Sequence, residues 1–141
     1  MKNSITTVYL GIAGLLLLII GSALLFTPHT FHGSNGIDLG SNPNLLSEIR
    51  APGGLLAASG ILALISMGRR NLRVFAMQVT VLVYGSFGLA RLVSLAIDGI
   101  PLGSIVGAAI LELLVAAVGV ALVSRAYGAP NARLAGRSTT A

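Results

Sequence analysis

The sequence has no cysteine and very few charged residues. The absence of cysteine excludes disulfides, thiolate metal sites and thiol catalysis, and it leaves the redox compartment open. Charged residues make up 9 % of the 141 residues and hydrophobic residues 55 %, whereas a soluble protein has roughly 25 % charged residues. So few polar side chains cannot cover a water-soluble core of this size. The composition therefore predicts one small membrane domain over residues 1–141.

The charges that are present have a basic excess, with a formal net charge of +5. The basic residues lie beside apolar segments and form no patch with interleaved aromatic residues, so we expect no binding to nucleic acid. We expect them instead to meet anionic lipid headgroups and to set the topology of the chain. The lipid bilayer is therefore the first expected partner.

Four long apolar runs predict four transmembrane helices. Each run is close to the 20 or so residues that cross a hydrocarbon core of roughly 30 Å, and none alternates as a membrane β-strand does. The first run is longer than the core of a signal peptide, which favours a retained helix over a cleaved one. The predicted helices cover about residues 6–26, 48–67, 73–97 and 101–125, with an outer loop over 27–47 and a cytoplasmic tail over 126–141. Asn42-Pro43 and Ser47 are alternative starts for the second helix.

The basic residues also predict the orientation of this bundle. With four crossings, most of them fall on one side: Lys2, Arg69, Arg70, Arg73, Arg125, Arg133 and Arg137. Cytoplasmic segments carry an excess of Lys and Arg, so we expect both termini in the cytoplasm. The sequence thus predicts an all-α, antiparallel bundle of four transmembrane helices, a multi-pass protein of the inner (plasma) membrane.

Two opposite charges, Arg91 and Glu112, interrupt the third and fourth apolar runs. A charge in lipid costs about 2.5–3.5 kcal/mol on insertion scales, so a retained one usually faces a partner or a wet cavity. Arg91 lies six residues before Ile97 and Glu112 eight residues after Ser104, which places them roughly 9 and 12 Å from the outer side. We therefore predict an ion pair between these residues, expensive to break from one side.

Further polar residues are predicted to gather near this pair, in the outer half of the bundle. On the third helix, polar or small residues recur every three or four positions and share one face: Thr80, Tyr84, Gly88, Arg91, Ser94 and Asp98. Tyr84 is expected to be a buried, hydrogen-bonding aromatic residue. The candidate site is Glu48, Arg50, Tyr84, Arg91, Asp98 and Glu112. These charges either lock the helices in register or line a cavity or pathway open to the outside.

No motif predicts catalysis or a cofactor. The sequence has no phosphate-binding loop, no G-x-S-x-G and no defensible Ser–His–Asp arrangement. His29 and His32, with Asp38 as a third ligand, have metal-like spacing, but in a Gly-rich loop nothing fixes their rings. We therefore expect no catalytic residue, no metal site, no cofactor and no enzymatic activity.

Four short motifs carry a family resemblance. They are Glu48-Ile-Arg50-Ala-Pro52-Gly53-Gly54, Gly88-Leu-Ala-Arg91, Asp98-Gly99-Ile-Pro101 and Glu112-Leu-Leu. Their order and spacing resemble a bacterial family of four-helix membrane proteins, the domain of unknown function 4345. The resemblance implies a four-helix fold and emphasises the same charges, but it implies no reaction. Pro52 stands where the family often has an aromatic residue, so the bend at this point stays open.

Two functional hypotheses follow. The first is a non-enzymatic accessory or ligand-binding protein, in which the charges hold the bundle and a polar lipid headgroup or small ligand. The alternative is a small transporter that uses Glu112 and completes its pathway by oligomerising, although a nearby Arg should neutralise that carboxylate. A membrane protein or a second copy of this chain is the expected protein partner.

Overall fold

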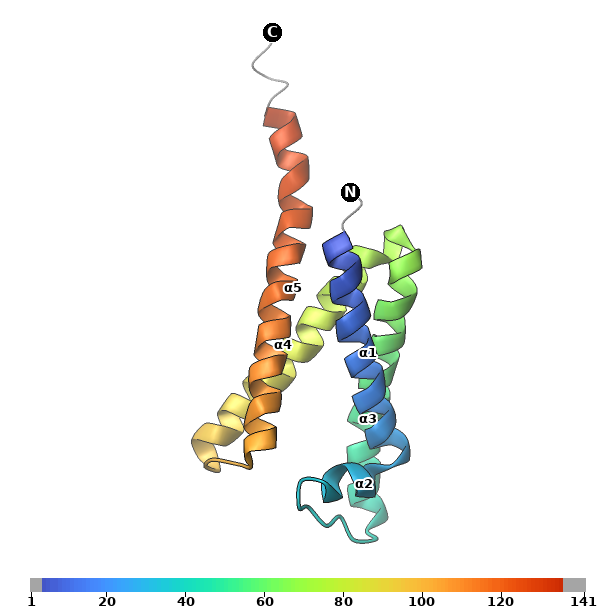
Figure 1. Ribbon diagram of the computed structural model, residues 1–141, viewed down its shortest axis with the longest axis vertical. Helices are drawn as coiled ribbons and strands as arrows, with labels where there is room; N and C mark the ends of the chain where they lie inside the picture. Colours follow the sequence, from blue (N-terminus) through green and yellow to red (C-terminus); the bar gives the residue numbers. More distant parts are fainter. Residues whose placement is uncertain (1–3, 136–141) are drawn as a thin grey trace.

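The computed structural model describes residues 4–135, and the side-chain surroundings of residues 4–127. In this part of the chain every regular element is helical: α1 (Ser4–Phe26), α2 (Pro28–Gly33), α3 (Pro43–Gly68), the 3₁₀ turn η1 (Arg70–Leu72), α4 (Arg73–Ile97) and α5 (Gly103–Ala135). Four of these helices, α1, α3, α4 and α5, are long and apolar enough to cross a membrane. They alternate in direction, so both ends of the described chain lie at the same end of the molecule (Figure 1). The predicted all-α architecture with four spans is confirmed.

Two predicted boundaries differ from the structure. Helix α3 begins at Pro43 instead of residue 48, because the Asn42 side chain accepts a hydrogen bond of 2.9 Å from the Asn44 amide and proline fits the first turn. Helix α5 continues to Ala135 instead of ending near residue 125. The prediction ended the helix where the apolar run ends, but a helix can continue from the bilayer into water. The basic residues Lys2 and Arg137 lie outside the described residues.

Helices α1 and α3 form a closely packed hairpin. Their backbones touch at glycine: a Cβ added at Gly21 would lie 2.7 Å from the carbonyl oxygen of Gly53, and one at Gly60 would lie 2.6 Å from that of Gly14. Close backbone contact of this kind holds transmembrane helices together, because in lipid the burial of apolar surface alone does not drive helix association. The first hairpin is therefore held along most of its length.

Helices α4 and α5 form the second hairpin, joined by a short turn. Asp98 ends α4, and Gly99 turns the chain with a φ of 95°, a conformation that glycine adopts without strain. Gly88 of α4 lies against Leu113 of α5, where an added Cβ would approach the leucine side chain to 2.8 Å. This contact sets the register of the two helices near the charged residues.

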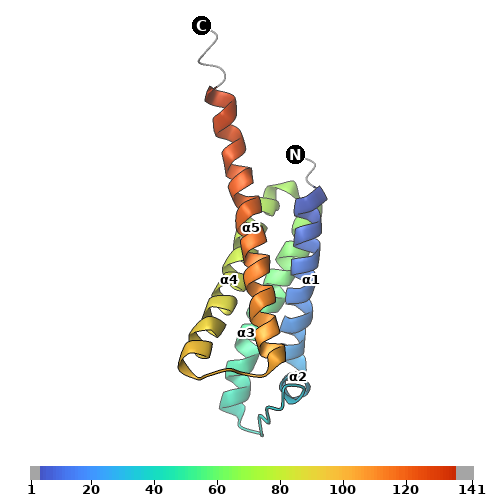
Figure 2. The ribbon, with the colours of Figure 1, turned by 60° about the vertical axis from the view of Figure 1, so that its left-hand side comes forward.

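The two hairpins meet toward the end that carries the termini and diverge toward α2 (Figure 1). Two tyrosines bridge them: Tyr9 Oη donates to the Val115 carbonyl at 3.2 Å, and Tyr84 Oη donates to the Ala13 carbonyl at 2.9 Å. Helix α2 lies across the other end, below α1 and beside the start of α5 (Figure 2). Phe31 and His32 of α2 contribute to the lining of a cavity between the hairpins.

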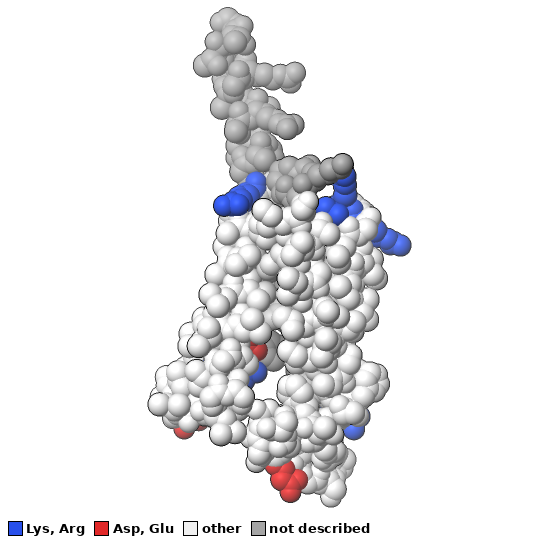
Figure 3. Space-filling view, viewed as in Figure 1, with Lys and Arg blue, Asp and Glu red and all other residues white. Residues whose placement is uncertain are grey.

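The outer surface suits a bilayer. Along α1 the large aliphatic side chains that point away from the bundle are Ile5, Val8, Ile12, Leu15 and Ile19. Most basic residues gather at the end that carries the termini and acidic residues near the α2 end, and the band between them is white except for a small red and a small blue patch in its hollow (Figure 3). An apolar band of this kind, flanked by charge, is typical of a multi-pass membrane protein.

Candidate functional site

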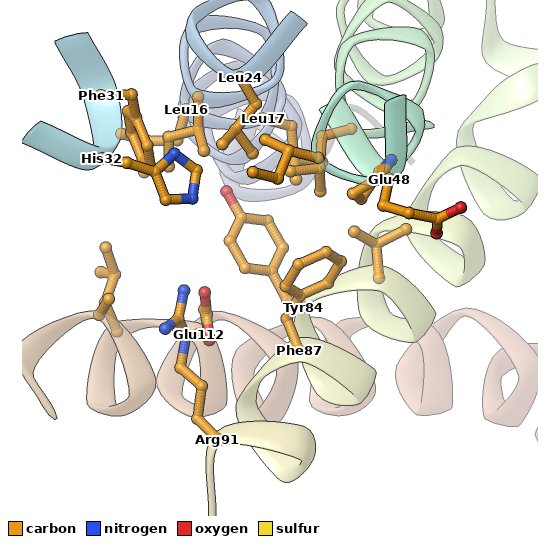
Figure 4. Close-up of a pocket in the computed structure, with 17 residues that line it drawn as sticks. Leu16, Leu17, Leu24, Phe31, His32, Glu48, Tyr84, Phe87, Arg91 and Glu112 are labelled. Atoms are coloured by element: carbon orange, nitrogen blue, oxygen red, sulfur yellow. Dashed lines mark hydrogen bonds and ion pairs between the residues drawn. The ribbon is translucent and has the colours of Figure 1, made fainter. Parts of the chain in front are cut away.

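A cavity of about 310 Å³ lies between the two hairpins. Its walls come from all five α-helices and are mostly apolar, with Leu17, Leu24, Leu56, Val83, Phe87 and Leu111 among them. The polar residues that reach it are His32, Glu48, Tyr84, Arg91 and Glu112 (Figure 4). The cavity thus combines long apolar walls with a small polar region.

Arg91 and Glu112 form the predicted ion pair. Arg91 Nε donates to Glu112 Oε2 at 2.9 Å, and the two side chains are 35 % and 14 % exposed. The pair forms because α4 and α5 are antiparallel neighbours joined by a tight turn, which puts the two residues at similar depth. Each charge lowers the cost of holding the other away from water.

The pair leaves polar atoms unused. Over residues 4–127, the Nε–Oε2 contact is the only hydrogen bond that either side chain makes. The terminal guanidinium nitrogens of Arg91 are therefore donors without a protein acceptor, and Glu112 Oε1 is an acceptor without a protein donor. The polar end of the cavity can both donate and accept hydrogen bonds.

Helix α2 adds His32 to the site, which the sequence analysis placed in a loop with nothing to fix its ring. That expectation is wrong for His32: its Nδ1 lies 3.1 Å from the Pro28 carbonyl, and its ring packs edge-on against Phe31. Since a carbonyl can only accept, Nδ1 donates this hydrogen bond, and Nε2 takes no part in it. In the sequence, Pro28 is the residue that indicates this short helix, because proline is favoured in the first turn of a helix. Residues 28, 31 and 32 then share one face of it.

Tyr84 is the buried hydrogen-bonding aromatic residue that the sequence predicted. It is 4 % exposed, lines the cavity, and uses its hydroxyl on the Ala13 carbonyl. The hydroxyl therefore ties α4 to α1 and is not part of the ion pair. Tyr9, the other tyrosine that bridges the hairpins, was not among the predicted site residues. A single tyrosine in an aliphatic run could have indicated its buried hydrogen bond.

The other predicted members do not join the pair. Glu48 lines the cavity, but its carboxylate points away from Arg91 and Glu112 (Figure 4). Arg50 Nη1 donates instead to the Leu25 carbonyl at 2.9 Å, because the last carbonyls of a helix lack partners within it. The Asp98 carboxylate accepts from Ser94 Oγ at 2.9 Å on the outer surface. The predicted cluster of five charges is thus wrong: across residues 4–127 the structure has one ion pair, Arg91–Glu112.

A second, more polar cavity of about 260 Å³ adjoins the first. Both cavities are lined by Phe31, His32, Arg91 and Ala108, so Arg91 lies where they meet. Ser104 and Asn35 line only the second cavity, and Ser104 Oγ donates to Asn35 Oδ1 at 2.8 Å. This bond ties the start of α5 to the segment after α2. The polar cavity lies on the α2 side of the ion pair.

The arrangement suits noncovalent binding by hydrogen bonds and apolar contact. In the described part of the chain, no three His, Asp or Glu side chains gather closely enough to hold a metal ion. What the site offers is a neutralised ion pair, a fixed imidazole and an extended apolar wall.

Comparisons with known proteins give one result. The family model for a domain of unknown function, DUF4345, matches residues 5–123, which cover most of all four spans and every residue of the candidate site. The chain matches no curated protein and no solved structure at a level that shows relatedness. The resemblance that the charged motifs indicated is thereby confirmed. The chain belongs to the DUF4345 family.

Proposed function

We propose that this protein is an integral membrane protein that binds a small amphiphilic ligand between its two hairpins. The observation that carries the proposal is an apolar cavity of about 310 Å³ that ends at the Arg91–Glu112 ion pair. Ligand sites typically have volumes of about 300–1,000 Å³, apolar walls and a few convergent polar groups. A ligand with an apolar body and one polar end matches this arrangement.

The ion pair favours binding over transport coupled to protons. A carboxylate that carries protons across a membrane has to be free to gain and lose them, whereas Glu112 is held by Arg91 at 2.9 Å. The transporter that the sequence left open is therefore the second candidate, and it has no separate observation in its favour.

The distribution of charge supports an orientation in the inner membrane. Arg69, Arg70 and Arg73 lie around the α3–α4 turn and Arg125 lies near the same end, whereas Asp38 and Asp98 lie near the other. The positive-inside tendency then puts the termini in the cytoplasm and α2 on the outer side. The ligand site would face the outer leaflet.

Native mass spectrometry of the protein released from mild detergent or nanodiscs tests the proposed function. We expect a co-purified amphiphile of defined mass on the wild-type protein, lost or greatly reduced when Leu56→Trp fills the cavity. Arg50→Gln is the matched control, because Arg50 lies on α3 outside the cavity lining. A protein without bound amphiphile, and with no uptake of amphiphiles added to it, would contradict the proposal.

The same preparation separates the alternatives. Proton-coupled flux in liposomes that Glu112→Gln abolishes while the fold survives would establish the transporter instead. A second protein that co-purifies with an empty cavity would favour an accessory role that does not depend on a ligand.

A further inference from the structure

We infer that the bound amphiphile is uncharged and single-chained, with a head such as a hydroxyl that both donates and accepts hydrogen bonds. This inference rests on the proposed function and specifies the ligand of that same site. It follows from three properties of the cavity: its charge balance, its unused polar atoms and its size.

The two charges at the polar end of the cavity, where the head would lie, cancel. Arg91 and Glu112 carry opposite charges 2.9 Å apart, and the carboxylate of Glu48 points away from them (Figure 4). The His32 ring is held by its Nδ1 on the Pro28 carbonyl. A charged head would enter this region without a counter-ion of its own, and an unpaired charge away from water is strongly unfavourable. An uncharged head avoids that cost.

The unused atoms match an uncharged hydroxyl. A hydroxyl has one proton to donate and two lone pairs with which to accept. The terminal nitrogens of Arg91 supply donors, and Glu112 Oε1 supplies an acceptor on the same ion pair. Nε2 of His32 is a further polar atom in the lining of the cavity. One hydroxyl can therefore bridge the pair without displacing either partner.

The volume and shape favour one chain. The apolar cavity, at about 310 Å³, lies at the lower limit of typical ligand sites, which leaves little room for a second chain. The adjoining polar cavity of about 260 Å³ gives the head space beyond Arg91. A head in the polar cavity and a chain along Leu17, Leu56 and Phe87 would use both.

The site has a route from the bilayer. Figure 3 shows a hollow between the two halves of the molecule, with a basic and an acidic patch inside it, in the band that bears no other charge. Because this hollow opens sideways among lipid-facing helices, an amphiphile can enter from the membrane without passing through water. Membrane-soluble single-chain compounds are the class of molecule that such an entrance admits.

Three probes with the same chain and different heads test the inference: oleyl alcohol, oleate and oleylamine. Binding to the wild-type protein in nanodiscs is measured by native mass spectrometry or by competition with a fluorescent fatty alcohol, at neutral pH. We expect oleyl alcohol to bind at least about tenfold more tightly than either charged probe. Equal affinity for all three, or a preference for a charged probe, would overturn the inference.

Single substitutions of Arg91 and of Glu112 should shift the preference among the three probes in opposite directions. Glu112→Gln leaves the charge of Arg91 unbalanced, so the preference should shift toward oleate; Arg91→Gln leaves Glu112 unbalanced, so it should shift toward oleylamine. The double variant R91Q/E112Q restores neutrality and should again prefer the alcohol. Arg50→Gln, outside the cavity, is the control and should not alter the ranking. A ranking that the single substitutions leave unchanged would show that this pair does not select the head.

The outcomes separate the inference from the proposed function. If no probe binds the wild-type protein at all, the proposed function fails. If the probes bind and Leu56→Trp excludes them, but the alcohol has no advantage, only the inference about the head fails. Should a single variant not fold, the ranking on the wild-type protein and on R91Q/E112Q still decides the question.

Discussion

Tyr84 on α4 lines the cavity and donates a hydrogen bond of 2.9 Å to the backbone carbonyl of Ala13 on α1, and so joins the two hairpins. Removing the hydroxyl in Tyr84→Phe leaves the ring and its packing in place. We expect the variant to lose about 1 kcal/mol of stability. Unfolding by SDS, followed by circular dichroism, measures the loss.

Tyr127→Phe is the matched control for Tyr84→Phe. Tyr127 accepts a hydrogen bond from Gln78 and is 57 % exposed. Removing its hydroxyl should therefore change the free energy of unfolding by no more than a few tenths of a kcal/mol. Equal destabilisation by both substitutions would show that the Tyr84–Ala13 bond has no special role in holding the hairpins.

Removing one partner of the ion pair should destabilise the protein more than replacing both partners by apolar residues. Glu112→Leu leaves Arg91 without its partner within the membrane-spanning part of the chain, and we expect a loss of about 2 kcal/mol. In the double variant R91M/E112L no charge is left unpaired, and we expect stability close to wild type. SDS unfolding of Glu112→Leu, Arg91→Met and the double variant gives the coupling energy between the two residues. Additive losses would contradict the pairing.

Gly21 should tolerate no side chain. A Cβ there would lie 2.7 Å from the Gly53 carbonyl oxygen and would also meet the backbone of Ala57, so Gly21→Ala has to push α1 and α3 apart. We expect a loss of about 2 kcal/mol. Gly54→Ala is the control, since an added Cβ at Gly54 meets nothing within 4 Å, and alanine favours a helix by up to about 1 kcal/mol. Both are measured by SDS unfolding, and similar values for the two would contradict the close approach of the helices.

The proposed orientation can be tested with single cysteines, because the chain has none of its own. Ser41→Cys lies in the exposed segment before α3, and Asn71→Cys lies in the exposed turn η1. In intact cells a membrane-impermeant maleimide should label residue 41 at once and residue 71 only after permeabilisation. The reverse pattern would invert the orientation, and labelling of both from one side would contradict a four-span topology.

The spans and the ion pair could be predicted from the sequence because both depend on local, one-dimensional information. A long apolar run has few alternatives to a transmembrane helix. Once α4 and α5 are antiparallel neighbours, counting residues from their shared turn brings Arg91 and Glu112 to one depth. The same counting could not place Arg50, because its partner is the Leu25 carbonyl at the end of α1. That contact depends on how α1 and α3 lie beside each other, which the spacing along one helix does not contain.

The cavity could not be predicted because it arises from the divergence of two hairpins. Its position depends on the bridges from Tyr9 to Val115 and from Tyr84 to Ala13, which connect residues 106 and 71 positions apart in the chain. The role of His32 was missed for a related reason. A six-residue helix in a polar loop produces a weak periodic signal, and only the folded chain brings it beneath the bundle.

The meeting of the hairpins at one end has a mechanical consequence. Arg73 holds the joint between them, donating to the Ser66 and Met67 carbonyls at the end of α3. At the opposite end, the Ser104–Asn35 hydrogen bond is the one side-chain bond among residues 4–127 that links the start of α5 to the segment after α2. The two hairpins are thus held firmly at the α3–α4 turn and only weakly at the α2 end. The width of the gap between the hairpins at the α2 end should therefore respond more readily to the thickness of the surrounding bilayer than the spacing at the α3–α4 turn does.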